Sequence, residues 1–317
     1  MKAFETPVLF LVFNRPDTTA QVFAQIRAIQ PKYLYIAADG PRSVKEGEEE
    51  LCAETRRIAT AIDWDCELKT LFREQNLGCG KAVSEAITWF FEQVEEGVIL
   101  EDDCLPDMSF FTFAEELLIK YKYDREVMSI SGTNLLGSWK LPKQSYFFGH
   151  GGIWGWATWR RAWQLYDKNM DKWELPSTQE VIKKGLVTNE WYDFYKPMME
   201  SAFNDSIDTW DAQWVYSILF NRGKSINPCV NLVKNIGFDY RATHTITPND
   251  IVESLPLLQV TFPLMHPEIK EEDVDFLNIS YEVFTRDSLP RKTKDTIALK
   301  GFSKIQSYLS KIWRSFR

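Results

Sequence analysis

The chain has 317 residues, which is enough for one large α/β domain or two smaller ones. Hydrophobic residues make up 44% of the sequence and charged residues 26%, so the composition predicts a globular core rather than a disordered chain. The formal net charge of −8 argues against a general nucleic-acid-binding protein, which needs positive charge to meet phosphates.

The first hundred residues alternate between short apolar runs and longer periodic segments. The apolar runs predict strands at residues 8–13, 33–38, 66–72 and 98–100. The segments between them predict helices at residues 16–29, 48–62 and 81–94. This alternation indicates an α/β fold with a mainly parallel sheet flanked by helices. Pro106 is expected to stop the chain from continuing the fourth strand.

Polar motifs follow three of these strands directly. They are Asn14-Arg15, Asp39-Gly40 and Glu101-Asp102-Asp103. Ligands of such sheets bind beyond the carboxyl ends of the strands, so the three motifs are expected to face one crevice. The sequence has no GxGxxG after the first strand and no GxxxxGK[ST], which disfavours a dinucleotide-binding Rossmann domain and a P-loop.

The three adjacent carboxylates at residues 101–103 are costly to bury unless positive charge meets them. A divalent cation such as Mn²⁺ or Mg²⁺ is an economical partner, because it takes oxygen ligands and bridges to phosphate. A solvated acidic turn is the alternative. Arg15 is a candidate phosphate contact, and Asp39 a candidate acceptor of hydrogen bonds from a base or ribose.

Glycines precede the third predicted helix. Gly78 and Gly80, beside Lys81, would let the backbone approach a ligand, and the helix N-terminus would favour an anion. A plain turn is an equally good interpretation of the two glycines.

Residues 139–214 contain nine of the twelve tryptophans, most of which are expected in the core. One or two of them could form a platform for the apolar face of a sugar; the candidates are Trp154, Trp156 and Trp210. Asp211 begins an apolar helix that runs to Phe220, and is the best candidate for a general base. A helix-capping aspartate is the alternative.

The last quarter of the chain has a different character. His244 lies in a polar loop, as a metal or phosphate ligand or as an ordinary surface histidine. Residues 246–290 are rich in proline and acids without clear periodicity, which predicts a wrapping segment or linker.

Residues 291–317 form a basic C-terminal segment. They hold eight Lys and Arg and one acid, a net charge of +7, which leaves −15 for residues 1–290. Apolar residues recur there at steps of three and four, which predicts a basic amphipathic helix. It could dock on the acidic body of the protein, but its excess of basic residues favours an anionic membrane surface.

The five cysteines are scattered without the spacing of a zinc site, which fits a reducing cytosol. No stretch is long enough for a membrane span, and the apolar run at residues 8–13 is too short for a signal peptide. We expect a cytoplasmic protein, associated peripherally with the inner face of the cytoplasmic membrane through residues 291–317.

The motifs together resemble a known family. Phe13-Asn14-Arg15-Pro16, Asp39-Gly40, Asn76-Leu77-Gly78 and Ile99–Asp103 look like the donor-binding half of GT-A glycosyltransferases. The pattern is similar to N-acetylglucosaminyltransferase I and to bacterial relatives described as glycosyltransferases or hemolytic-protein-like. The likeness continues through Gly152–Trp156, Trp210-Asp211 and Ile226-Asn227-Pro228, and so covers residues 6–245.

The resemblance implies roles for individual residues. Asp103 matches the residue that holds Mn²⁺, Arg15 the arginine near the donor diphosphate, and Asp39 the aspartate at the uracil. Glu101 and Asp102 match positions that line the ribose and sugar. Asp211 looks like the base that deprotonates the acceptor hydroxyl for inverting transfer.

The resemblance also implies a division of the chain. Residues 1–106 would be the half that binds the nucleotide sugar, and residues 107–245 the acceptor half. Asn14, Gly78 and Lys81 would be further donor-binding residues. We expect a metal-dependent glycosyltransferase, with a nucleotide-diphosphate sugar as donor and a glycan or lipid-linked acceptor of bacterial surface polysaccharide or lipopolysaccharide synthesis. The alternatives are a sugar-phosphate nucleotidyltransferase and a catalytically silent module that binds nucleotide sugars.

Overall fold

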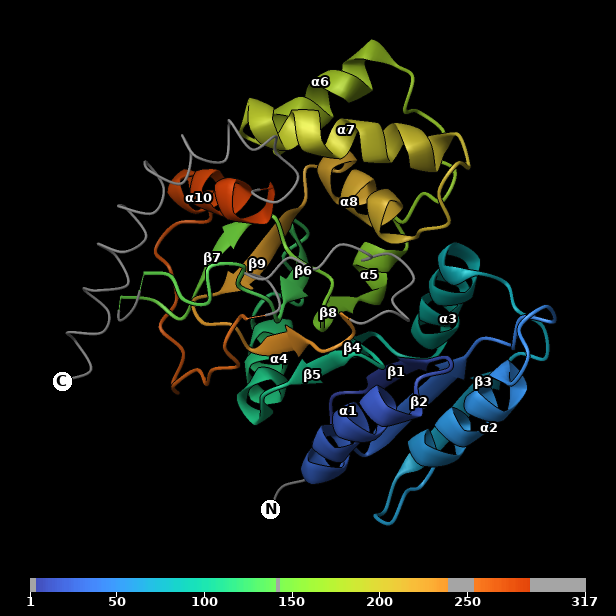
Figure 1. The fold of residues 1–317 in the computed structure, drawn as a ribbon. Helices are drawn as coiled ribbons and strands as arrows, with labels where there is room; N and C mark the ends of the chain where they lie inside the picture. The colour runs from blue at the N-terminus through green and yellow to red at the C-terminus, as the bar shows by residue number, and fades with distance from the viewer. Residues whose placement is uncertain (1–3, 141–142, 239–253, 286–317) are drawn as a thin grey trace.

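The computed structural model describes residues 4–140, 143–238 and 254–285. Helices cover both faces of a large mixed sheet of eight strands in the order β3-β2-β1-β4-β8-β6-β9-β7 (Figure 1). A second, two-stranded sheet pairs β5 with β10. The α/β fold with a mostly parallel central sheet, expected from the sequence, is confirmed.

The predicted strands and helices of the first hundred residues are all present. The strands are β1 (Val8–Val12), β2 (Tyr33–Ala38), β3 (Glu67–Phe72) and β4 (Glu96–Glu101), and the helices are α1 (Pro16–Ile29), α2 (Glu48–Ala59) and α3 (Cys79–Gln93). Strand β1 pairs in parallel with β2 and with β4, and β2 pairs in parallel with β3. The polar motifs that follow β1, β2 and β4 therefore leave the same edge of the sheet.

The other half of the chain extends the same sheet. Its elements up to α8 are β5 (Cys104–Pro106), α4 (Met108–Lys120), β6 (Val127–Ser131), β7 (Tyr146–Gly149), β8 (Trp156–Trp159), α5 (Arg160–Trp163), α6 (Pro176–Gly185), α7 (Asn189–Phe203) and α8 (Asp211–Phe220). Strands β9 (Lys224–Pro228) and β10 (Val233–Asn235) and helix α10 (Val274–Thr285) follow. Strand β8 lies antiparallel between β4 and β6 and joins the two halves.

Each face of the sheet has its own core. On β1, Val8, Phe10 and Val12 belong to a cluster with buried side chains of α1 and α4. Leu9 and Leu11 belong to a second cluster with α3 and with tryptophans of β8, α5 and α8. This alternation is what a strand covered on both faces requires, because successive side chains point to opposite sides.

The fourth strand does not continue past Pro106, as expected. Strand β4 ends at Glu101, and the chain then forms the separate short strand β5, whose last residue, Pro106, pairs with Val233 at the edge of a two-stranded sheet where proline is tolerated. Within residues 246–290, expected to be a wrapping segment or linker, α10 forms and buries Phe276 and Leu277. Packing against the core stabilises this helix, which the weak periodicity of the sequence did not indicate.

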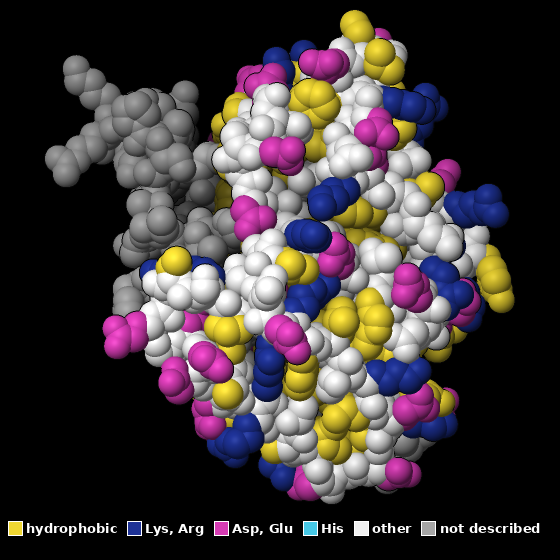
Figure 2. All heavy atoms as spheres, turned by 90° about the vertical axis from the view of Figure 1, so that its right-hand side faces the viewer, with side chains coloured by type: hydrophobic (Ala, Val, Ile, Leu, Met, Phe, Trp, Pro, Cys, Tyr) yellow, Lys and Arg dark blue, Asp and Glu magenta, His cyan; other side chains and the backbone are white. Residues whose placement is uncertain are grey.

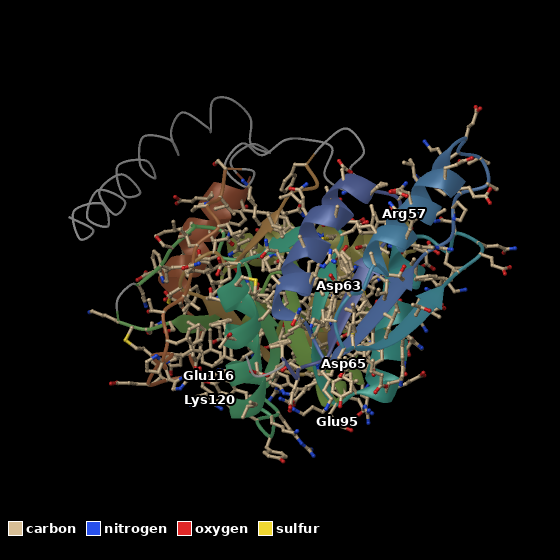
Figure 3. The ribbon with its side chains drawn as sticks, turned by 90° about the horizontal axis from the view of Figure 1, so that it is seen from below. Arg57, Asp63, Asp65, Glu95, Glu116 and Lys120 are labelled. Carbon is tan, nitrogen blue, oxygen red and sulfur yellow. The ribbon has the colours of Figure 1, made fainter. Side chains whose placement is uncertain are left out.

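Charged side chains are spread over the outside. Figure 2 shows acidic and basic side chains interspersed with apolar ones on one face of the molecule. Figure 3 labels Asp63, Asp65 and Glu95, which precede β3 and β4 at the amino ends of the strands. None of the helices in the described ranges is long and apolar enough to cross a membrane. The expected basic helix at residues 291–317, and His244, lie outside the described residues.

Candidate active site

A cavity of about 710 Å³ lies at the carboxyl ends of the strands. Its walls include the residues that follow β1, β2 and β4, together with parts of α7, α8 and α10, which lie on the same side of the sheet in Figure 1. Most of the residues singled out from the sequence meet here: Asn14, Arg15, Asp39, Gly78, Glu101, Asp102, Asp103, Trp154, Trp210 and Asp211.

The carboxylates after β4 are tied to the loop after β1. The backbone N–H of Phe13 donates to Asp102 Oδ2 at 3.0 Å. Arg15 Nη1 donates to Asp103 Oδ2 at 3.0 Å, and both side chains of this ion pair are largely buried. Among the described residues, Arg15 is the one cation that forms an ion pair with these three carboxylates.

Burial makes this negative charge costly. It raises the pKa of Glu101 well above its usual value, and the neighbouring charges of Asp103 and Asp102 raise it further. Burial and the charge of Asp103 raise the pKa of Asp102 to about 7. The pKa of Asp103 is also raised by burial, against the opposing effect of Arg15. Such a group of carboxyls would gain from a cation ligand.

The oxygen ligands in the cavity fit a cation that the protein would hold only in part. Asp103 supplies hard carboxylate oxygens, as Mn²⁺ and Mg²⁺ prefer. Among the described residues, no group of three or more His, Cys, Asp and Glu side chains is arranged to hold a metal ion by itself. Sites of this kind are completed by water and substrate phosphates.

Asp39 organises the neighbouring turn. Its carboxylate accepts hydrogen bonds from the backbone N–H groups of Leu77, at 3.0 Å, and Gly78, at 3.2 Å, and from the Asn76 amide at 3.0 Å. Burial nevertheless raises the pKa of Asp39. A contact between Asp39 and a base or ribose would compete with these bonds. The structure therefore shows that Asp39 holds the turn at residues 76–78 in place, which the sequence did not predict.

Asn14 is part of a network at the cavity wall. Its amide donates to Glu48 Oε1 at 2.9 Å, and Arg42 forms an ion pair with the same carboxylate. Burial opposes the ionisation of Glu48, but the hydrogen bonds and charge of Arg42 outweigh it and lower the pKa of that carboxyl. Arg42, which also lies over the Phe13 ring, is a cavity residue that the sequence analysis missed.

The first two N–H groups of α3 are already bonded within the chain. The backbone N–H groups of Cys79 and Gly80 both donate to the carboxylate of Asp208, each at 2.8 Å. An anion site at this helix end, one of the two interpretations of Gly78 and Gly80, is therefore filled by the chain itself. Lys81 is half-exposed beside Glu85 and is not among the residues that line the cavity.

Asp211 lies in the cavity wall at the start of α8. Its Oδ1 accepts hydrogen bonds from the backbone N–H of Ala212, at 2.9 Å, and from the hydroxyl of Thr209. These are its only hydrogen bonds to the residues that the structure describes, and both use the same oxygen. The other carboxylate oxygen accepts no hydrogen bond from these residues. Asp211 is the first residue of α8 and Trp210 holds the cap position, so Asp211 is not the helix-capping residue that the sequence offered as the alternative.

The three tryptophans expected to bind an acceptor differ in their surroundings. Trp154 and Trp210 line the cavity. Trp156 has no exposed surface and stacks on Trp210 with the ring centres 5.6 Å apart. The prediction that Trp156 contacts an acceptor directly is therefore wrong, because its buried ring packs against Trp210 instead. Eight of the nine tryptophans between residues 139 and 214 are buried, as expected.

An aromatic part of the cavity wall was not anticipated. It includes Trp191 and Tyr195 of α7 and Phe276 of α10. His150 packs edge-on against Trp191 and Tyr195. Burial lowers the pKa of His150 to about 4, against a small opposing effect of the Gly185 backbone, so the ring is neutral near pH 7. Spacing along α7 marks such residues as core, which is why the sequence did not single them out.

Comparisons with known proteins identify no family. No protein-family model matches the chain, and no curated protein matches it. Solved structures with partial similarity include a cytidylyltransferase from Leptospira borgpetersenii (TM-score 0.29, 12% identity, 53% of this chain and 63% of that one). Mouse xyloside xylosyltransferase 1 (TM-score 0.31, 9% identity, 68% and 81%) and the glycosyltransferase GlyE from Streptococcus pneumoniae (TM-score 0.33, 15% identity, 95% and 64%) also match.

The chain spans less than two thirds of the length of the cytidylyltransferase and of GlyE. Scores and identities this low assign no activity to the chain, so its function has to be inferred from the cavity.

Proposed function

We propose that the chain is a glycosyltransferase of the GT-A class, which transfers a hexosyl or N-acetylhexosaminyl group from a nucleotide-diphosphate sugar, in the first instance a UDP-sugar. One observation carries this proposal. A carboxylate cluster with its arginine and a second, separate carboxylate, Asp211, line the same cavity at the carboxyl ends of the parallel strands. A donor diphosphate would meet the cluster, and an acceptor hydroxyl would meet Asp211.

The proposed reaction is a single displacement with inversion. Asp211 takes the proton of the acceptor hydroxyl as its oxygen forms a bond to the anomeric carbon and the bond to the diphosphate breaks. Arg15 places positive charge beside the cluster, and Trp154 and Trp210 offer aromatic surface to a sugar. A divalent cation at Asp103, Mn²⁺ or Mg²⁺, would stabilise the charge of the departing diphosphate.

The acceptor we propose is a glycan or lipid-linked saccharide of bacterial surface polysaccharide or lipopolysaccharide synthesis. A peripheral position at the inner face of the cytoplasmic membrane would suit a lipid-linked acceptor, with the basic residues 291–317 as the attachment. Sedimentation with anionic liposomes tests this part. Equal binding by the full chain and by a chain lacking residues 292–317 would refute it.

The reaction itself is tested by product analysis with a panel of UDP-hexoses and lipid-linked acceptors. We expect sugar transfer with release of UDP, loss of transfer with EDTA, and recovery with Mn²⁺. Release of pyrophosphate from a nucleoside triphosphate and a sugar phosphate would instead identify a nucleotidyltransferase. No calorimetric binding of UDP in the presence of Mn²⁺ would contradict both enzymatic assignments.

A further inference from the structure

The segment that carries Asp211 is fastened to the other half of the molecule by Asp208. The carboxylate of Asp208 bridges two residues of the first turn of α3, with Oδ2 accepting from Cys79 N–H and Oδ1 from Gly80 N–H, both at 2.8 Å. A carboxylate at this end of a helix satisfies two backbone donors and also meets the positive end of the helix dipole. The contact spans about 130 residues of sequence.

The backbone of α3 is shaped to receive this side chain. Gly78 has a φ of +82°, and a Cβ there would lie 2.4 Å from Asp208 Oδ2. A Cβ on Gly80 would lie 2.7 Å from the carbonyl oxygen of Thr209 and 2.9 Å from Asp208 Oδ1. The close approach of the 208–209 segment therefore requires glycine at both positions, and the positive φ of Gly78 favours glycine there independently.

The three residues after Asp208 lead directly to the proposed base. The hydroxyl of Thr209 donates to Asp211 Oδ1. Trp210 stacks in the tryptophan cluster, and its carbonyl accepts from the Tyr166 hydroxyl at 3.2 Å. The packing of Trp210 on the tryptophan cluster thus holds one side of the segment, and the bonds of Asp208 to α3 attach the segment to the proposed donor half.

We propose that Asp208 is a positioning residue, which fixes Asp211 relative to the donor half through the first turn of α3. This inference rests on the proposed function, because it assumes that Asp211 takes the acceptor proton. Asp208 itself is bonded to backbone groups and is not assigned a contact with either substrate. A base that is misplaced by about 1 Å can lose a factor of ~100 in rate, so even a small relaxation of the segment would be measurable.

The test compares Asp208→Asn with the wild-type chain. The amide keeps the size of the side chain but turns an NH₂ group toward one of the two backbone donors. We expect kcat for sugar transfer to fall by ~10-fold or more, while the calorimetric affinity for UDP with Mn²⁺ changes less than about twofold. Asp205→Asn, three residues earlier in the same loop and exposed, is the matched control and should keep wild-type kinetics.

A second variant reaches the same contact from the other side. Gly80→Ala leaves Asp208 intact but pushes its segment away, and alanine would by itself favour the helix. We expect the same loss of kcat, and the double variant should lose little more than either single one, because the two changes break one contact. Amide hydrogen exchange at Cys79 and Gly80 should accelerate in Asp208→Asn, which tests the contact without any assay of activity.

Each result decides the matter. Wild-type kcat in Asp208→Asn would overturn the inference alone, and so would a loss of UDP affinity at unchanged kcat, which would place Asp208 in donor binding. A wild-type chain that binds nucleotide but transfers no sugar would refute the proposed function, and the role of Asp208 with it.

Discussion

At the scale of single residues, the cavity concentrates three carboxylates, of which only Asp103 forms an ion pair with the residues that the structure describes. Glu101, Asp102 and Asp103 follow one another where β4 ends, and Arg15 forms an ion pair with only the last of them. Burial raises the pKa of all three carboxyls, which is an unfavourable arrangement for stability alone. Groups arranged in this way are typical of binding and catalytic sites.

Asp103→Asn tests the role of the cluster in metal binding. We expect the Mn²⁺-dependent affinity for UDP to fall by at least ~10-fold, because an amide is a weaker ligand for a hard cation than a carboxylate. Calorimetry with and without EDTA measures this. Asp65→Asn, an exposed aspartate before β3 (Figure 3), is the control. Equal affinities in Asp103→Asn and wild type would rule out Asp103 as the metal ligand.

Asp211→Asn tests the base. Asparagine can still accept the bond from the Ala212 N–H, so the start of α8 should be preserved. Without a proton acceptor, kcat should fall by a factor of ~10² to 10⁴, while the affinity for UDP stays the same. Steady-state kinetics together with calorimetry separate the two quantities. An unchanged turnover number would remove Asp211 from the mechanism.

At the scale of elements, the ends of neighbouring parallel strands are locked to each other by short loops. Asp39, after β2, holds the turn at residues 76–78 through three donors, and that turn leads into α3. Asp208 then holds the first turn of α3 against the segment before α8. A chain of polar contacts therefore runs from the edge of the sheet to the proposed base.

Gly40→Ala should break the first link of that chain. The added Cβ would lie 2.4 Å from the backbone carbonyl carbon of Gln75, which the turn cannot accommodate without moving. We expect a loss of ~1–3 kcal/mol in the free energy of unfolding and a fall in affinity for UDP. Gly47→Ala is the control: it meets no atom within 4 Å and should lose some stability but no affinity. Unaltered binding in Gly40→Ala would show that the turn does not shape the donor site.

At the scale of the whole molecule, the buried carboxyls make stability depend on pH. The pKa of Asp102 is raised from 3.8 to about 7, so the folded protein keeps a proton that the unfolded chain has already released in this range. Stability therefore falls as the pH rises from about 4 to 7, since the unfolded state binds fewer protons there. The buried carboxylates therefore lower the stability of the folded protein, and a bound cation would reduce this cost.

Asp102→Asn should therefore stabilise the metal-free protein at pH 8. Asparagine removes the buried charge and can still accept the bond from the Phe13 N–H. We expect a gain of ~1–4 kcal/mol at pH 8 that disappears below about pH 4. Chemical denaturation in EDTA at both pH values measures it, with Asp65→Asn as the exposed control. A loss of stability at pH 8 would contradict the raised pKa.

Local patterns were sufficient for much of this molecule. The order of strands and helices through β4 follows from apolar periodicity, and the convergence of the motifs at residues 14–15, 39–40 and 101–103 follows from the geometry of parallel strands. These are properties of sequence neighbours and of one repeated sheet pattern, so the sequence alone determined them.

Only the tertiary structure decided what each side chain meets. Asp208 is an unremarkable loop aspartate until the fold brings α3 to it from about 130 residues away. Trp154 and Trp156 have the same neighbourhood in sequence, yet the first lines the cavity and the second is buried behind Trp210. Helix α10 forms where periodicity is weak, because packing on the core supplies the stabilisation. Contacts distant in sequence leave no local pattern, which is why the carboxylates that line the cavity could be named in advance and Asp208, the residue that we propose positions Asp211, could not.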